Sequence, residues 1–124
     1  GRFRGMKPAT AKAKGRAVEN AVVAFLQSFG LPVERRRLQG SKDKGDIAGW
    51  QRVAVEIKSG GGTLKIPQWL RETAVEKQNA GADVGVLVIR PRGVTDPAQF
   101  WAVQPLGEWL ELMDLAGYVG ADNG

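Results

Sequence analysis

The sequence predicts an α/β fold in which helices flank a central mixed β-sheet. Apolar residues at helical spacing open the chain, strand-like runs with turn signals occupy its middle, and residues 84–89 are almost wholly apolar. Such a run is typical of a strand that is covered on both faces by helices. The expected order is helix, three strands, helix, strand, strand, helix. At 124 residues the chain fits one domain, which we place at residues 16–120.

The chain opens with a basic segment. Residues 1–15 contain five Lys or Arg, no acidic residue, three glycines and a proline, so we expect a flexible arm. From Arg16 to Phe29 apolar residues recur at helical spacing, and Gly30 and Pro32 end the predicted helix. Glu19 lies at the margin of its apolar stripe, within reach of a sheet edge.

Three strands are predicted next. Residues 33–38 form the first, and a polar loop over residues 39–45 follows it. Residues 47–50 and 53–58 are expected to form a hairpin with a turn near residues 49–52.

The C-terminal half supplies the remaining elements. A glycine-rich connector at 59–63 precedes a helix that Pro67 opens and Gly81 ends, and its expected inner face carries Trp69, Leu70, Thr73, Ala74 and Lys77. The strand at 84–89 is expected to be central, a last strand is expected at 100–103, and a last helix at 106–115. We expect Trp101 and Trp109 in the core.

Composition narrows the possible chemistry. The chain has no Cys and no His, which excludes disulfides, thiolate or imidazole metal sites and nucleophilic triads. Carboxylates and lysines remain as catalytic groups. Apolar runs are far shorter than the ~20 residues of a membrane span, and no signal peptide is visible, so we expect a soluble cytoplasmic protein of a bacterium or a phage-infected cell.

Charge is distributed unevenly along the chain. Residues 1–58 carry thirteen Lys or Arg and five Asp or Glu, a net +8, whereas residues 59–124 carry a net −3. A basic surface of this kind is expected to meet a polyanion, because each neutralised phosphate releases counterions. The sequence therefore predicts a nucleic-acid partner.

Acidic residues occupy unusual positions in the predicted hairpin. Glu56 and Lys58 project from one side of their strand, and the hairpin brings Asp46 opposite them. Carboxylate oxygens suit a hard divalent cation, and a neighbouring ammonium can stabilise charge on a phosphate. These features predict metal-dependent phosphodiester hydrolysis. The alternative is a structural trio, in which Lys58 offsets the repulsion between the two acids.

Residues 16–90 resemble the PD-(D/E)XK nuclease superfamily, and within it the archaeal-type Holliday-junction resolvases and their phage relatives. The residues that carry the resemblance are Arg16 and Glu19, Arg35 to Arg37, Gly40-Ser41, Asp46 and Glu56-Ile57-Lys58. Gly45 stands where the superfamily name has proline, and no motif is assigned beyond residue 90.

The resemblance implies a restriction-endonuclease-like sandwich that cleaves branched DNA as a homodimer, without a small-molecule cofactor. Asp46, Glu56 and the Ile57 carbonyl would bind Mg²⁺ or Mn²⁺, and Glu19 would act directly or through water. Lys58 would orient or help deprotonate the attacking water. Two alternatives stay open: a nuclease with another DNA target (nicking, repair or restriction-like), and a DNA-binding module that no longer cleaves.

Basic and polar side chains supply candidate phosphate contacts, which position a DNA backbone without reading its sequence. They are Arg2, Arg4, Lys7, Lys12, Lys14, Arg16, Arg35, Arg36, Arg37, Ser41, Lys42 and Lys44.

Overall fold

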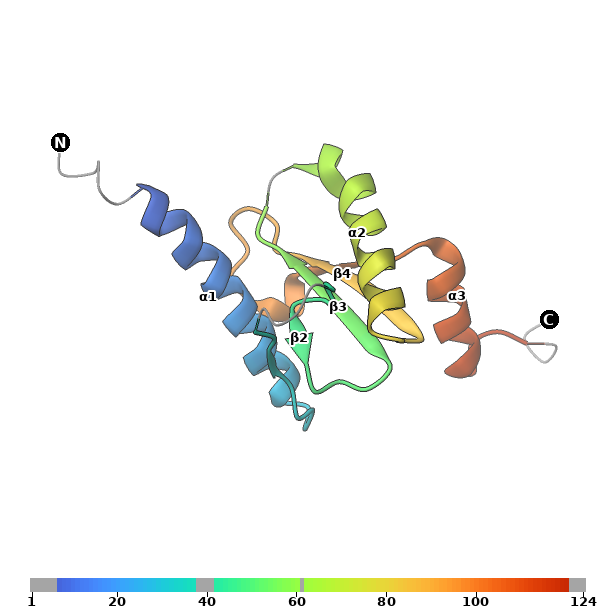
Figure 1. The fold of residues 1–124 in the computed structure, drawn as a ribbon. Coiled ribbons are helices and arrows are strands. Elements are labelled where there is room, and N and C mark those ends of the chain that lie inside the picture. The colour runs from blue at the N-terminus through green and yellow to red at the C-terminus, as the bar shows by residue number, and fades with distance from the viewer. Residues whose placement is uncertain (1–6, 38–41, 61, 121–124) are drawn as a thin grey trace.

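The computed structural model describes residues 7–37, 42–60 and 62–120, and it has an α/β fold with three α-helices and a three-stranded mixed sheet (Figure 1). No helix in these ranges is both long and apolar enough to cross a membrane. The elements are α1 (Lys7–Gln27), β1 (Glu34–Arg35), β2 (Ile47–Ala48), β3 (Val53–Lys58), η2 (Thr63–Lys65), α2 (Ile66–Asn79), β4 (Val84–Ile89), η3 (Pro97–Gln99), β5 (Trp101–Val103) and α3 (Leu106–Leu115).

Helix α1 begins nine residues before the predicted start at Arg16, so the expectation of a flexible arm is wrong for residues 7–15. The segment after Pro8 is rich in Ala and Lys, which are strong helix formers, and a proline in the first turn leaves no needed hydrogen bond unmade. Helix propensity therefore outweighs the basic charge. Arg2 and Arg4 lie outside the described residues.

Strand β4 is central, as predicted. It pairs in parallel with β3 and antiparallel with β5. The expectation of one sheet containing all five strands is wrong, because in the described part of the chain β1 and β2 form a separate two-stranded sheet of two residues each. Strand β2 ends at Ala48, and the next residue, Gly49, has a φ of +92° and lies so close to the Pro32 carbonyl oxygen that a Cβ there would clash.

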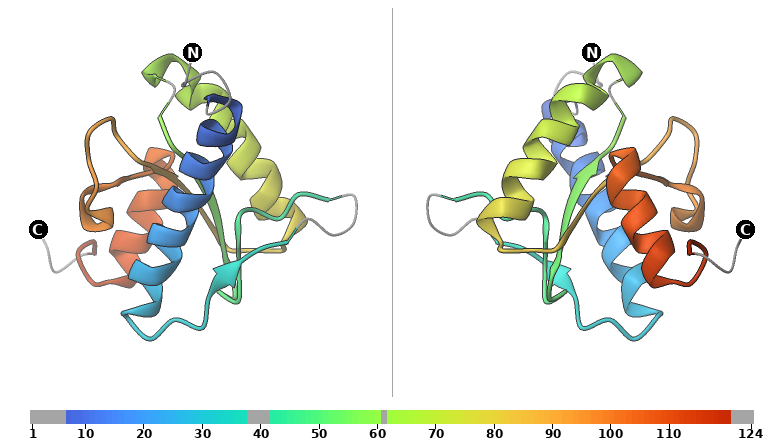
Figure 2. Two further views of the ribbon diagram at one scale, coloured as in Figure 1. Left: turned by 90° about the vertical axis from the view of Figure 1, so that its left-hand side faces the viewer. Right: turned by 90° about the vertical axis from the view of Figure 1, so that its right-hand side faces the viewer.

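The two faces of β3 pack against different helices, as Figure 2 shows for α1 and α2 on opposite sides of the sheet. Val55 and Ile57 join the α1 core with Val18 and Val22. Because a strand alternates its faces, Glu56 and Lys58 point to the α2 side, where Leu87 and Ile89 of β4 pack against Trp69. The charged residues of β3 thus face α2.

Helix α3 does not enter the core, contrary to expectation. Trp109 is 48% exposed and Trp101 on the edge strand β5 is 50% exposed. No residue of α3 is buried; a Glu108 to Lys77 ion pair (Oε1 to Nζ, 2.8 Å) joins the helix to α2. Helix α3 has an apolar face, as the sequence predicts, but no other described element of this chain covers that face.

Candidate active site

The acidic and basic residues predicted to carry chemistry come together at the C-terminal end of β3. They line one small pocket of about 130 Å³, to which α1, the loop before β2 and β3 all contribute. The lining residues are Gly15, Glu19, Asp46, Glu56, Ile57, Lys58 and Ser59. The fold thus brings Glu19, Asp46, Glu56, Ile57 and Lys58 to one pocket.

Three hydrogen bonds hold Asp46 in place, two of them to β3 and one to Arg36, the residue after β1. Its N–H donates to the Val55 carbonyl (2.8 Å), its own carbonyl accepts from the Arg36 N–H (2.8 Å), and its Oδ2 accepts from the Ile57 N–H (2.7 Å). Asp46 is thus fixed at the pocket both by its backbone and by one carboxylate oxygen.

Gly45 makes this approach possible. Its φ of +99° lies in the left-handed region that favours glycine, and its N–H donates to Asp43 Oδ1 at 2.9 Å. Proline could supply neither that φ nor that N–H. The backbone of this loop therefore requires glycine at position 45.

Glu56 and Lys58 face the inner side of α2. Glu56 is 5% exposed, and its Oε2 lies 3.4 Å from Lys58 Nζ. The same ammonium lies 3.6 Å from Glu72 Oε1 and 5.7 Å from the centre of the Trp69 ring. Lys58 is held among two carboxylates and an aromatic face, which favours its charged form.

Glu19 reaches the pocket from α1. Its Oε1 lies 3.8 Å from Arg35 Nη2, a loose and partly exposed ion pair. Burial raises the Glu19 pKa, the nearby Asp46 charge raises it further, and Arg35 opposes both. The helix glutamate and the loop aspartate thus line the same pocket.

Two further acids on α2 were not anticipated. Glu72 and Glu76 lie on the inner face of the helix together with Trp69 and Thr73, and Glu76 is only 1% exposed. Ala74, expected on that face, is exposed instead. A signal for them is present in the sequence, because residues 69, 72, 73 and 76 follow helical spacing, but the predicted inner face does not include the two acids.

Glu76 is a buried acid without a hydrogen-bond donor. Among the described residues no N–H or hydroxyl reaches either of its carboxylate oxygens, nor Oε2 of Glu72. An unsatisfied buried carboxylate is costly, so its oxygens require a proton or a cation.

The acids Glu56 and Glu76 have raised pKa values, because they are buried and lie close to other acidic residues. Burial raises the Glu56 pKa, and the adjacent Asp46 and Glu76 carboxyl groups raise it further. Burial also raises the Glu76 pKa. Burial lowers the pKa of Lys58, but the negative charges of Glu56 and Glu72 outweigh this effect, so its pKa is raised. Without a cation, the site therefore holds protons and keeps Lys58 as an ammonium.

The donor set of the pocket fits a water-rich magnesium site. In the described part of the chain no three acidic side chains converge closely enough to hold a metal by themselves. Mg²⁺ typically uses one or two carboxylates and fills its remaining positions with water and substrate phosphate. Asp46, Glu56 and the Ile57 carbonyl match that requirement, and Glu19 lines the same pocket.

The predicted phosphate contacts divide into three groups. Exposed side chains are those of Lys12, Lys14, Arg16, Arg35, Arg37, Lys42 and Lys44. Arg36 is partly buried and donates from Nη2 to the Ile47 carbonyl at 3.1 Å, which gives it a structural role. Arg2, Arg4 and Ser41 lie outside the described residues, and Lys7 contributes backbone to the first turn of α1.

Comparison of the chain with family models, with curated proteins and with solved structures gave no significant match.

Proposed function

We propose that the protein is a metal-dependent DNA endonuclease that hydrolyses phosphodiesters at branched DNA, as the resemblance to Holliday-junction resolvases implies. The observation that carries the proposal is the convergence of Glu19, Asp46, Glu56 and Lys58 on one pocket from three separate elements. A set of surface charges would not be held by backbone hydrogen bonds and burial in this way.

Each residue has a role that its geometry allows. Asp46 and Glu56 would hold Mg²⁺ or Mn²⁺, with the Ile57 carbonyl as a third oxygen donor. The bound ion would lower the pKa of a water and polarise the phosphoryl oxygen. Lys58, kept charged by Glu56 and Glu72, would orient the phosphate and stabilise its developing negative charge rather than remove a proton. Glu19 would bind a water at the rim of the pocket.

A homodimer is part of the proposal. The exposed apolar face of α3, formed by Leu106, Trp109 and Leu110, is suited to a second copy of the chain. A twofold dimer would present two equal sites to a junction of near-twofold symmetry. Sedimentation velocity of the wild type and of a Trp109→Glu variant tests this, since the variant should be monomeric.

The direct test uses a synthetic four-way junction and a linear duplex of the same sequence, each with Mg²⁺, with Mn²⁺ or with EDTA. We expect metal-dependent, symmetric cuts in the junction. Asp46→Asn should abolish them. The matched control is Asp83→Asn, because Asp83 pairs with Arg52 near the opposite end of β3.

Two other results of this cleavage experiment would favour a different function. Equal cutting of the linear duplex would point to a nuclease with another DNA target. Junction binding without product in either metal would point to a DNA-binding module that no longer cleaves.

A further inference from the structure

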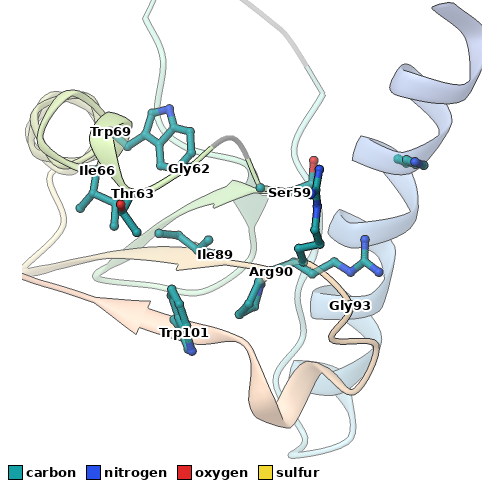
Figure 3. A pocket seen from close by; sticks show the side chains of 13 residues that line it. Ser59, Gly62, Thr63, Ile66, Trp69, Ile89, Arg90, Gly93 and Trp101 are labelled. Atoms are coloured by element: carbon teal, nitrogen blue, oxygen red, sulfur yellow. The ribbon is translucent and has the colours of Figure 1, made fainter. Parts of the chain in front are cut away.

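A second, larger pocket lies beside the candidate active site. It encloses about 780 Å³ and is lined by side chains from α1, α2, β4, β5 and the loop after β4 (Figure 3). Its aromatic residues are Trp69 and Trp101, and its cations are Lys14, Arg90 and Arg92. None of the described residues that line it is acidic. We call it the tryptophan groove.

The groove continues directly from the candidate active site. Ser59, the residue after β3, lines both pockets. Strand pairing places Lys58 beside Ile89, and Ile89 beside Trp101, so the three side chains form a row across the α2 face of the sheet. Two strand spacings, about 10 Å, separate the two ends of this row. A ligand at Trp101 would therefore lie within one nucleotide or two of a phosphate at Lys58.

The chemistry of the groove suits an unpaired nucleotide. Trp101 is half exposed, which leaves an indole surface free for stacking, and Trp69 and Ile89 form an apolar wall. Arg90 is anchored by a hydrogen bond from Nε to the Val94 carbonyl (2.7 Å), which orients its guanidinium, and Arg92 is exposed. An aromatic platform combined with cations that contact the backbone is the usual way in which proteins bind single strands.

We propose that the tryptophan groove binds an unpaired base of the DNA substrate next to the cleaved phosphate, with Trp101 stacking on the base and Arg92 and Lys14 contacting its flanking phosphates. This inference rests on the proposed function and narrows its substrate class to branched DNA with single-stranded character at the branch point. A base inside a duplex cannot offer its face to Trp101 without leaving the stack. The pocket volume lies within the range of roughly 300–1,000 Å³ typical of sites for small molecules, so a base with its sugar fits.

The test measures binding in EDTA, where cleavage plays no part. Fluorescence anisotropy of a labelled 12-nucleotide single strand is compared with that of an abasic strand of equal length and charge. We expect the wild type to prefer the strand with bases. Trp101→Ala should raise its Kd about 5- to 150-fold, Trp101→Phe should largely restore binding, and Arg92→Ala should weaken binding to both strands. Phe29→Ala is the matched aromatic control, because Phe29 is exposed at the far end of α1, and Arg52→Gln is the basic control.

The outcomes separate this inference from the proposed function. Two results would overturn the groove as a base-binding site even if junctions are cut. The first is equal affinity of the wild type for the abasic strand and the strand with bases. The second is an unchanged Kd for Trp101→Ala, provided that this variant keeps the wild-type circular dichroism spectrum and melting temperature. If Trp101→Ala weakens binding of the strand with bases but the protein cuts no DNA, the groove is supported as a base-binding site and the proposed nuclease function is overturned.

Discussion

Asp46 accepts a hydrogen bond at Oδ2 from the Ile57 N–H, at 2.7 Å, and this bond fixes a loop carboxylate against the C-terminal end of the buried strand β3. Ile57 directly follows Glu56, so the same contact places the two acids side by side. Their proximity is unfavourable without a counter-charge, and the raised pKa of Glu56 expresses that cost. Four predictions follow from the local geometry.

Gly45→Ala should destabilise the protein and displace Asp46. The added Cβ would lie 2.9 Å from the Val55 carbonyl oxygen, in a residue whose φ is +99°. We expect a loss of about 1–3 kcal/mol in the free energy of unfolding by urea, with loss of cleavage. Gly30→Ala is the control, since its φ of +85° carries the backbone cost but a Cβ there meets nothing within 4 Å. Equal losses for the two variants would contradict the steric argument.

Asp46→Asn and Asp46→Ala should distinguish the role of the carboxylate charge from the role of the hydrogen bond to Ile57. Asparagine keeps a side-chain oxygen that can accept the Ile57 N–H, whereas alanine leaves that donor unpaired. Both should abolish cleavage and spare DNA binding. We expect only alanine to lower the unfolding free energy, by about 1–3 kcal/mol. Unfolding of both variants would instead indicate that the acid serves the fold alone.

The metal-free protein should become less stable as the pH rises. Glu19, Glu56 and Glu76 have pKa values above their ordinary 4.5 in the folded state, so the folded chain holds protons that the unfolded chain releases. Their stabilising contribution is complete below pH 4.5 and is lost as the pH rises through the folded-state values. Lys58 does not add to this window, because its pKa is raised above 10.5.

Melting temperatures in EDTA should therefore fall between pH 5 and pH 8. Glu76→Gln should flatten this slope and raise the melting temperature at pH 8, because the neutral amide removes a buried charge without a donor. Asp83→Asn should leave the slope unchanged. Added Mg²⁺ should restore stability at pH 8 in the wild type. A flat wild-type profile would show that the acids are solvated rather than crowded.

Lys58→Met should reduce cleavage by roughly 10²-fold while leaving junction binding intact. Methionine keeps the apolar stem against Trp69 but removes the ammonium that lies between Glu56 and Glu72. Lys65→Met, at an exposed position in η2, is the control. Steady-state cleavage of the junction with Mg²⁺ gives the measurement, and unaltered cleavage would remove Lys58 from the chemistry.

Much of the architecture could be predicted from local pattern. The continuous apolar run at Val84–Ile89 indicated a central strand, and Val53–Lys58 alternates as a strand that is buried on two different faces. The boundaries of these strands and of α3 were predicted correctly, because hydrophobic periodicity is encoded locally. The start of α1 at Lys7 differs from the prediction, because the helix propensity of Ala and Lys outweighs the basic charge of this segment.

The sequence by itself determined the α/β class, the order of the elements and the identity of the charged residues that gather in one pocket. Only the tertiary structure decided that Glu72 and Glu76 join that pocket's surroundings, that Gly45 rather than proline is needed before Asp46, and that Trp101 and Trp109 stay exposed. The physical reason is that periodicity shows which side of an element is apolar or charged. What covers that side depends on contacts between segments far apart in the chain.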